Sequence, residues 1–503
     1  MARLKARRSR YRLSNRLASG APAAIIAAVL LVAVGGASLA AGRVVSFLNT
    51  VTGGGVSAKT IGRIVGAPDP EPDPSSLAYK LKHKQKINLL FLGYGGDEND
   101  APYLTDSMMV VTIDPGTGRV AETSVPRDMW VKMPVNPALG TTWSEKINAA
   151  YEIGAQPGTV LNPAASFTGR DGGGHAAEAS VTKVTGVKFD RYFGVDFKAF
   201  RDVVDALGGV TVHMDGPLDD CHYPDYHDGY INHGVPPGYP CPPGSGIHFR
   251  AGDYAVSGEQ ALQIARSRDA IEAAQATDFG RARRQQMIIS AIRSQATGFS
   301  LLTKGPQLMS ALQRNFRTDV SFDDLVALYE WGKGIDEKNI LHFALTNSNL
   351  LTDQDQCGQP AGVYALCAED PSYKMIANYF NNELAPPVVL TAKAPVQVVW
   401  SGNSGFDPTP LSDRVTDALK PFNLALADPL RASGRVDKTV IYDYSNGQYP
   451  ETAQFLSQFL GGADVVVATP STPAPIKGRT LSTTGFVIFL GHDYGIRWYN
   501  LAS

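Results

Sequence analysis

A strand, turn and strand pattern places the strongest constraint on how this chain folds. Residues 107–113 and 119–125 have the β-branched and other apolar side chains typical of strands, and Asp114-Pro-Gly-Thr-Gly118 between them has a turn composition. In an antiparallel hairpin the residues that flank the two strands meet at the open end. The pattern therefore predicts that Asp106 and Arg127 lie close together.

Neighbouring segments extend this hairpin into an α/β unit. The apolar residues 87–92 predict a further strand, which leads into Gly93-Tyr-Gly-Gly96, either a plain loop or a close approach of backbone to ligand. Strands are also predicted at 191–195 and 210–214, with an amphipathic helix at 197–207 between them. This order indicates a helix that crosses between strands.

Arginines gather around a second helical pattern. Ser257 and Gln260 have the spacing of a capping box, which predicts a helix start. If the chain leaves this helix in an extended conformation, Arg266 and Arg268 point to the same side. Two guanidinium groups would then lie together.

A following helix is predicted to begin at Asp278. Asp278, Arg281 and Gln285 fall on one helical face, which Ile288 and Ile292 continue as an apolar stripe. Arginines collected near a core repel one another unless an anion neutralises them, and the guanidinium fork suits phosphate oxygens. The sequence therefore predicts an anion site, with a salt-bridged helix surface as the alternative.

The amino-terminal region predicts a membrane anchor. Residues 1–20 are strongly basic, and 21–42 are uncharged and long enough to cross a bilayer as a helix. The positive-inside rule then keeps the tail cytoplasmic and places everything after Arg43 outside the cell. Cleavage of a signal peptide near 38–42 is the alternative. Residues 43–76, rich in glycine and proline, predict a spacer.

Composition narrows the class of protein. The chain has 503 residues, 44% of them hydrophobic, which is enough for more than one buried core. A net charge of −2 argues against general affinity for nucleic acid, and the nine histidines show no zinc-binding spacing. The four cysteines suit an oxidising exterior if Cys221 pairs with Cys241 and Cys357 with Cys367, although free buried thiols stay open.

The pattern changes after residue 384. Residues 77–384 are predicted to form one α/β domain, with rim insertions at 162–175 and 218–246. A proline-containing linker begins the second unit, 385–503. Its predicted strands are 396–400, 439–443, 463–468 and 486–490, and its predicted helices lie near 411–419 and 451–460. This indicates a small carboxy-terminal α/β domain.

Together these residues resemble the LytR-CpsA-Psr family over residues 87–296. The matching segments follow the family's order and are 88–93, 104–109, 124–128, 146–151, 192–196, 205–210, 265–269 and 278–286. The resemblance implies a three-layer α-β-α core with a mixed central sheet, an apolar tunnel for a prenyl chain, and a LytR-type carboxy-terminal domain. It also implies an extracytoplasmic phosphotransferase in the cell membrane that moves a glycopolymer from a polyprenyl-pyrophosphate carrier to a peptidoglycan hydroxyl.

The resemblance also assigns site residues. It implies Asp106 as the ligand of Mg²⁺, and pyrophosphate binding by Arg127, Arg266, Arg268, Arg281 and Gln285. Asp106, Arg127, Asp278 and Arg281 are the implied catalytic residues. The family frequently has arginine or serine just before the metal-binding acid, whereas this chain has Tyr103-Leu-Thr105.

Several roles stay open at this level. Asp128 and Asp278 are both candidates for the proton acceptor, and Lys146 and Asn148 serve equally well to order a loop or to contact substrate. One hard cation and several arginines suit phosphoryl transfer, which depends on neutralising phosphate charge. The alternative function is a non-catalytic protein that binds polyprenyl phosphate or regulates the cell wall. A DNA-binding role conflicts with the predicted outside location.

Overall fold

The fold is taken from a computed structural model of the chain. It describes residues 71–96, 101–156, 162–221, 223, 246–267, 270–276, 278–296, 316–332, 334–353, 357–400, 411–431, 436–472, 481, 484–491, 493 and 494. The predicted basic tail, the membrane anchor and most of the spacer lie outside these residues. Among the residues that are described, none of the helices combines the length and the apolar character that crossing a bilayer requires.

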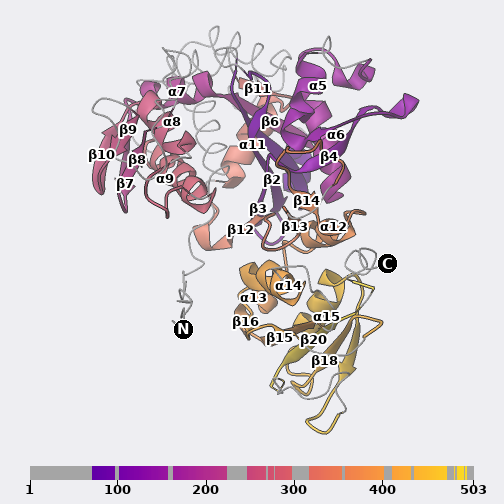
Figure 1. The fold of residues 1–503 in the computed structure, drawn as a ribbon. Helices are drawn as coiled ribbons and strands as arrows, with labels where there is room; N and C mark the ends of the chain where they lie inside the picture. The colour runs from indigo at the N-terminus through magenta and orange to yellow at the C-terminus, as the bar shows by residue number, and fades with distance from the viewer. Residues whose placement is uncertain are drawn as a thin grey trace.

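A six-stranded mixed sheet forms the centre of the larger unit (Figure 1). In spatial order its strands are β11 (Phe316–Thr318), β6 (Arg191–Asp196), β1 (Ile87–Tyr94), β2 (Thr105–Asp114), β3 (Arg119–Val125) and β12 (Ile340–Ala344). The predicted hairpin is confirmed, since β2 pairs with β3 in antiparallel register from Met108↔Val125 to Asp114↔Arg119. β1 pairs antiparallel with β2 and parallel with β6, which makes the sheet mixed.

Both faces of this sheet are buried, because successive side chains of its strands enter two different cores. Leu90 and Leu92 of β1 belong to one core, and Leu89 and Phe91 belong to the other. The second core lies under α4 (Leu77–Lys82), α7 (Phe197–Ala206), α8 (Gly258–Arg266), α9 (Asp278–Ala296) and α11 (Phe322–Gly332). The first lies under α5 (Glu152–Ala155), α6 (Gly172–Thr185) and α12 (Lys374–Asn381). The predicted three-layer α-β-α core is therefore confirmed.

Short strands decorate this core. They form four separate pairs: β4 (Trp130–Asn136) with β5 (Thr141–Lys146), β7 (Val210–Met214) with β10 (Gly252–Val256), β8 (Leu218–Asp220) with β9 (Ile247–Phe249), and β13 (Leu351–Thr352) with β14 (Cys367–Ala368). The 3₁₀ turns are η2 (Pro137–Leu139), η3 (Ile147–Tyr151), η4 (Ala165–Phe167) and η5 (Glu337–Asn339). The expected crossing helix α7 therefore joins β6 to a strand of another sheet, because β7 finds its partner in β10.

A second six-stranded sheet makes the carboxy-terminal unit an α/β structure as well. Its strands are β15 (Pro395–Trp400), β16 (Ala425–Leu426), β17 (Leu430–Arg431), β18 (Val440–Asp443), β19 (Asp464–Val467) and β20 (Phe486–Leu490). Its helices are α13 (Pro387–Ala392), α14 (Leu411–Leu419), η6 (Lys420–Phe422) and α15 (Pro450–Phe459). The expected linker is instead the helix α13, which starts at Pro387 and buries Val389 completely.

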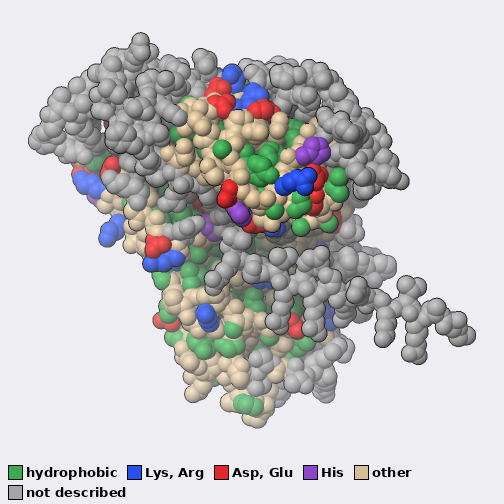
Figure 2. Space-filling model, turned by 90° about the vertical axis from the view of Figure 1, so that its left-hand side faces the viewer, with side chains coloured by type: hydrophobic (Ala, Val, Ile, Leu, Met, Phe, Trp, Pro, Cys, Tyr) green, Lys and Arg blue, Asp and Glu red, His purple; other side chains and the backbone are tan. Residues whose placement is uncertain are grey.

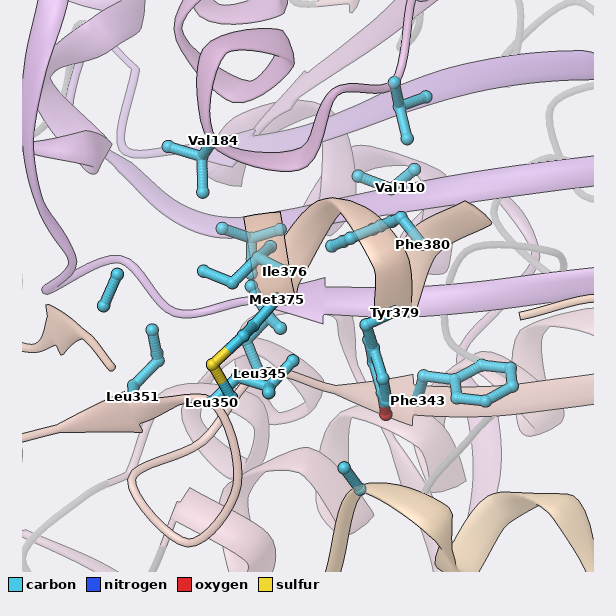
Figure 3. Close-up of a cluster of buried hydrophobic side chains, with 14 of the residues drawn as sticks. Val110, Val184, Phe343, Leu345, Leu350, Leu351, Met375, Ile376, Tyr379 and Phe380 are labelled. Atoms are coloured by element: carbon cyan, nitrogen blue, oxygen red, sulfur yellow. The ribbon is translucent and has the colours of Figure 1, made fainter. Parts of the chain in front are cut away.

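The two units share one continuous apolar core. Figure 3 shows its centre, where Met375, Ile376 and Tyr379 of α12 lie among side chains of the central sheet and of the segment after β12. The Phe343 ring of β12 lies 5.6 Å from Tyr379 and 5.4 Å from Phe422 of the carboxy-terminal unit, centroid to centroid. The carboxy-terminal unit therefore packs against the layer that contains α12 (Figure 1).

Candidate active site

An acid and an arginine meet at the open end of the central hairpin, as the sequence predicts. Asp106 is the second residue of β2, so it lies inside the strand and not before it, and Arg127 follows β3. The Arg127 Nη1 donates to Asp106 Oδ1 at 2.5 Å. Both side chains remain partly open to solvent, with 31% exposure for Asp106 and 26% for Arg127. The pair is therefore accessible to a ligand.

The charged row continues beyond this pair. The Arg127 Nε lies 3.4 Å from Asp128 Oδ2, and Lys146 Nζ donates to Asp128 Oδ1 at 2.7 Å. Two carboxylates and two cations thus alternate in the order Asp106, Arg127, Asp128 and Lys146. We call these four residues the charged row. Because Arg127 contacts a carboxylate on each side, its guanidinium plane is held in a defined orientation.

Backbone hydrogen bonds hold the charged row in place. The amide of Asn148 donates to the Arg127 carbonyl at 3.3 Å, and the Asn148 carbonyl accepts from Thr105 Oγ1 at 3.1 Å. The Ile147 amide donates to the Met129 carbonyl at 2.7 Å. Asn148 is almost fully buried, so it orders the segment. The Lys146 ammonium, in contrast, is itself a member of the charged row.

The glycine-rich sequence after β1 packs closely at the same end of the sheet. Gly96 has a φ of +79°, and a Cβ added there would come within 2.9 Å of the Asp196 Cβ. The Asp196 carboxylate accepts from the Ala199 amide and so caps α7. The neighbouring Tyr94 stacks on Tyr151 with 4.8 Å between ring centroids, and burial raises the pKa of the Tyr94 hydroxyl. Glycine is needed at position 96 for both backbone conformation and space.

Arg266 lies beside the end of β6, which β1 separates from β2 in the sheet. It ends α8, whose capping box between Ser257 and Gln260 is confirmed. Its guanidinium lies over the ring of Phe197, 4.3 Å from the centroid, and Phe197 directly follows β6. Burial raises the pKa of the nearby Tyr223 to about 12, and the charge of Arg266 opposes this rise.

Strand register relates Arg266 to the charged row. Asp196 of β6 pairs with Tyr94 of β1, and Tyr94 pairs with Thr105 of β2. Two strand spacings of about 4.8 Å therefore separate the end of β6 from the start of β2, or about 10 Å.

The remaining predicted residues lie on or near α9. This helix begins at Asp278, and Ile288 and Ile292 are buried, as the stripe predicts. Arg281 is half-buried, and Gln285 Nε2 donates to the carbonyl of Ala265 at 3.3 Å, which joins α9 to the end of α8. Arg268 lies outside the described residues.

Arg284 is a buried arginine that the sequence patterns do not single out. Its Nε donates to the Ile264 carbonyl at 2.8 Å, its Nη2 to the Ser267 carbonyl at 2.5 Å, and its Nη1 to the carbonyl and side-chain oxygens of Gln275. Burial lowers its pKa to about 10, and the neighbouring Arg281 adds to this effect. The sequence patterns do not predict this role, because the partners of Arg284 are mostly backbone carbonyls, which no residue type marks in a sequence.

The carboxylates of the charged row suit a metal ion that a bound phosphate also coordinates. Groups of three or more metal-ligating side chains are absent from the part of the chain that the structure describes. The charged row supplies two carboxylates, Asp106 and Asp128, both partly exposed. Mg²⁺ frequently takes one or two carboxylates together with phosphate oxygens and water. The residues therefore fit a Mg²⁺ ion that binds with a phosphorylated substrate.

The histidines of the small sheets have acidic partners. His213 contacts Asp253 at 2.7 Å, and His248 contacts Asp219 at 2.8 Å. Figure 2 shows histidine side chains close to acidic and basic ones on this side of the molecule. The hydrogen bond that the His213 ring donates to the Asp253 carboxylate raises the pKa of His213. These exposed pairs are consistent with a polar surface.

One predicted disulfide is directly confirmed. Cys357 and Cys367 are bonded, with 5.7 Å between their Cα atoms. Cys221 is also disulfide-bonded, and Cys241, its expected partner, lies outside the described residues. The thiols among the described residues are therefore oxidised.

A mixed sheet between helical layers, with acids and arginines at one end of its strands, defines an α/β protein with a candidate anion-binding site. The sequence model of the LytR_cpsA_psr family matches residues 60–377, and the chain belongs to this family.

Similar proteins carry names that describe a transferase. The polyisoprenyl-teichoic acid–peptidoglycan teichoic acid transferase TagU of Bacillus cereus (strain AH820) is 27% identical over 251 residues, 50% of this chain and 66% of that protein. The TagV transferase of Bacillus subtilis (strain 168) is 29% identical over 269 residues, 53% of this chain and 58% of that protein. The matches thus span less than two thirds of these relatives.

Solved structures are similar at lower identity. The crystal structure of Bacillus subtilis TagV has 23% sequence identity and a TM-score of 0.40, and the match covers 60% of this chain and 98% of that one.

Proposed function

We propose that this protein is a phosphotransferase that moves a glycopolymer from a polyprenyl-pyrophosphate carrier to a hydroxyl group of peptidoglycan. The observation that supports this most directly is the partly exposed Asp106–Arg127 pair, at the same end of the sheet strands as Arg266. Membership of the family and the names of the similar transferases point to the same reaction. Residues 77–384 would form the catalytic unit and 385–503 an accessory unit.

The reaction requires positioning and charge neutralisation. The hydroxyl oxygen of the acceptor attacks the phosphorus next to the polymer, the bond from this phosphorus to the bridging oxygen breaks, and polyprenyl phosphate leaves with that oxygen. The acceptor proton passes to a base, for which Asp128 and Asp278 are the candidates. Arg127, Arg266, Arg268 and Arg281 would hold the phosphate oxygens, with Gln285 orienting the end of α8.

Asp106 would hold Mg²⁺, which neutralises phosphate charge when it is bound. In this proposal Arg127 Nη1 keeps the Asp106 carboxylate oriented, and Asp128 fixes the other side of the same guanidinium. Because both carboxylates contact Arg127, its guanidinium would meet the phosphates in one fixed orientation. Protein groups thus set the geometry around the ligand.

The proposed location is the outer face of the cell membrane. Residues 21–42 would cross the bilayer once, with the basic residues 1–20 in the cytoplasm and the catalytic unit outside. Because the donor is itself a membrane lipid, a tether would keep enzyme and donor in the same plane. The bonded Cys357 and Cys367 suit such an exterior.

The test is the substitution Asp106→Ala. We expect transfer to peptidoglycan to fall by about 10²–10³-fold, because the carboxylate that would hold Mg²⁺ beside the reacting phosphate is lost. Binding of the lipid donor should partly survive, since the arginines remain. The measurements are polymer transfer with Mg²⁺ or with EDTA, and donor lipid retained by the purified protein in detergent, by mass spectrometry.

The matched control is Asp202→Ala on α7. Asp202 also pairs with a cation, Lys198 at 3.1 Å, and its side chain is similarly exposed. It should leave transfer unchanged. Full transfer by Asp106→Ala, or transfer by the unaltered protein that EDTA does not affect, would contradict the assignment of Asp106.

A further inference from the structure

A disulfide-closed loop lies against the charged row. Cys357 and Cys367 close this loop, and its last residues are buried, with Ala365 at 3% and Leu366 at 8% exposure. The Leu366 amide donates to the Asp128 carbonyl at 2.9 Å, and the Trp130 amide donates to the Leu366 carbonyl at 2.9 Å. The loop is therefore joined by its backbone to the residue at the centre of the charged row.

The loop presents an aromatic ring beside this row. Tyr364, next to the buried Ala365, is 56% exposed. The Lys146 ammonium lies 6.0 Å from the centroid of its ring, and the same ammonium contacts the Asp128 carboxylate. The ring thus lies at the Lys146 end of the charged row. Tyrosine held by a rigid loop supplies binding area at a low cost in conformational entropy.

An exposed ring beside a carboxylate and an ammonium has the chemistry of a sugar subsite. The CH face of a pyranose packs on an aromatic ring, while its hydroxyls hydrogen-bond to charged groups nearby. Asp128 offers acceptors and Lys146 offers donors at the edge of the Tyr364 ring. The cation at this end of the row is Lys146, and the Asp128 carboxylate at 2.7 Å already balances its charge.

We propose that Tyr364, on the loop closed by Cys357 and Cys367, binds a pyranose ring of the acceptor glycan. This inference rests on the proposed function and names its acceptor subsite. Arg266 and Arg127 would hold the donor phosphates on one side, so the ring that brings the attacking hydroxyl would approach from the other, over Tyr364. Asp128 then lies between the acceptor ring and Arg127.

The test compares three variants of the full chain in detergent. Tyr364→Ala removes the ring, Tyr364→Phe keeps it, and Leu139→Ala is the control for loss of an exposed apolar side chain. Leu139 lies in η2 at the far end of the β4–β5 hairpin, about 20 Å from the charged row by strand rise. The substrates are a prenyl-pyrophosphate-linked disaccharide and soluble, un-cross-linked peptidoglycan strands.

We expect Tyr364→Ala to raise KM for the peptidoglycan strands about tenfold, with little change in kcat or in KM for the lipid donor. Tyr364→Phe and Leu139→Ala should stay near the unaltered protein. An acceptor KM that Tyr364→Ala leaves unchanged would overturn the inference. So would a rise confined to the donor KM, because the ring would then contact the donor glycan. Thermal unfolding confirms that each variant is folded.

Binding of a sugar probe separates the subsite from the reaction. The β-1,4-linked tetramer of N-acetylglucosamine should bind the unaltered protein in calorimetry, and Tyr364→Ala should weaken this binding to the same extent. If the unaltered protein binds the tetramer through Tyr364 but transfers nothing, the proposed reaction fails and the subsite stands. If transfer occurs and neither acceptor KM nor tetramer binding depends on Tyr364, the subsite fails alone.

Discussion

At the scale of single residues, Glu178 is a half-buried acid away from the candidate site. It lies on α6, where burial raises its pKa to about 8 and the charge of Asp319 adds to this effect, while Arg191 opposes it. Asp319 is fixed nearby, because it accepts from the amide of Tyr192 at 2.9 Å. Burial therefore favours the protonated form of Glu178 in the folded protein.

This protonation predicts a pH-dependent stability. The pKa of Glu178 is raised in the folded state above its unfolded value of 4.5, so its favourable contribution is complete below pH 4.5 and is lost as the pH rises through about 8. Glu178→Gln should therefore be more stable than the unaltered protein at pH 8, by about 1–3 kcal/mol, and should lose this advantage near pH 4.5. Urea unfolding at both pH values measures the difference, and parallel pH profiles would contradict the prediction.

The contact between Asp106 and Arg127 was predictable from the sequence, whereas Arg284 was not. A hairpin is a local structure, so the spacing of its flanking residues from one turn fixes which of them meet. The partners of Arg284 are backbone and amide oxygens in a connection between two helices. Every residue has a backbone oxygen, so the sequence alone does not show which of them Arg284 binds.

At the scale of elements, one side chain organises the connection between α8 and α9. Arg284 on α9 binds the last turn of α8 and the segment around Gln275, and Gln285 adds a bond to Ala265. Because Arg266 ends α8, these contacts also determine where its guanidinium lies. The connection is therefore part of the candidate site even though Arg284 itself is buried.

Arg284→Met should test this organisation. We expect a loss of about 2–4 kcal/mol in the free energy of unfolding, since several buried oxygens lose their donor. Amide hydrogen exchange of residues 264–276 should become faster, and retention of the donor lipid should weaken. The neighbouring Arg283→Met, where the side chain is half-buried, is the control and should cost less than about 1 kcal/mol. Equal losses of stability in the two variants would contradict the proposal that Arg284 organises the connection between α8 and α9.

Strand and helix positions followed from the sequence more readily than pairing partners. The strand at 210–214 was predicted, but its partner β10 is a later segment that the local pattern does not specify. The prolines before residue 396 suggested a linker, yet Pro387 occupies the first turn of α13, where proline is favoured. The helix is favoured over an extended linker because it buries the Val389 side chain completely.

At the scale of the whole molecule, an ion pair lies between the two units. Arg414 of α14 contacts Glu369 at 3.1 Å, and its Nη1 donates to the carbonyls of Asn347 and Leu351 at 2.8 and 2.6 Å. Both charged side chains are almost fully buried. The arginine therefore connects the carboxy-terminal unit with the segment from Asn347 to Leu351 and with Glu369, which follows β14.

Arg414→Ala should weaken this connection. Because it leaves Glu369 and two carbonyls buried without this donor, we expect a loss of about 3–5 kcal/mol in stability. The single unfolding transition that a shared core predicts should separate into two in calorimetry. Lys420→Ala, which removes the exposed partner of Asp417, is the control and should cost less than about 1 kcal/mol. A variant as stable as the unaltered protein would show that the units are held by the apolar core alone.

The bond between Cys357 and Cys367 has a practical consequence for anyone who prepares this protein. In a bacterial cytosol, glutathione keeps thiols reduced, so recombinant material made there would lack the covalent closure behind Tyr364. The loop would then be held by the two backbone hydrogen bonds of Leu366 and by the pairing of β14 with β13. Assays on such samples would understate acceptor use, and export to the periplasm or refolding with a disulfide isomerase should restore it.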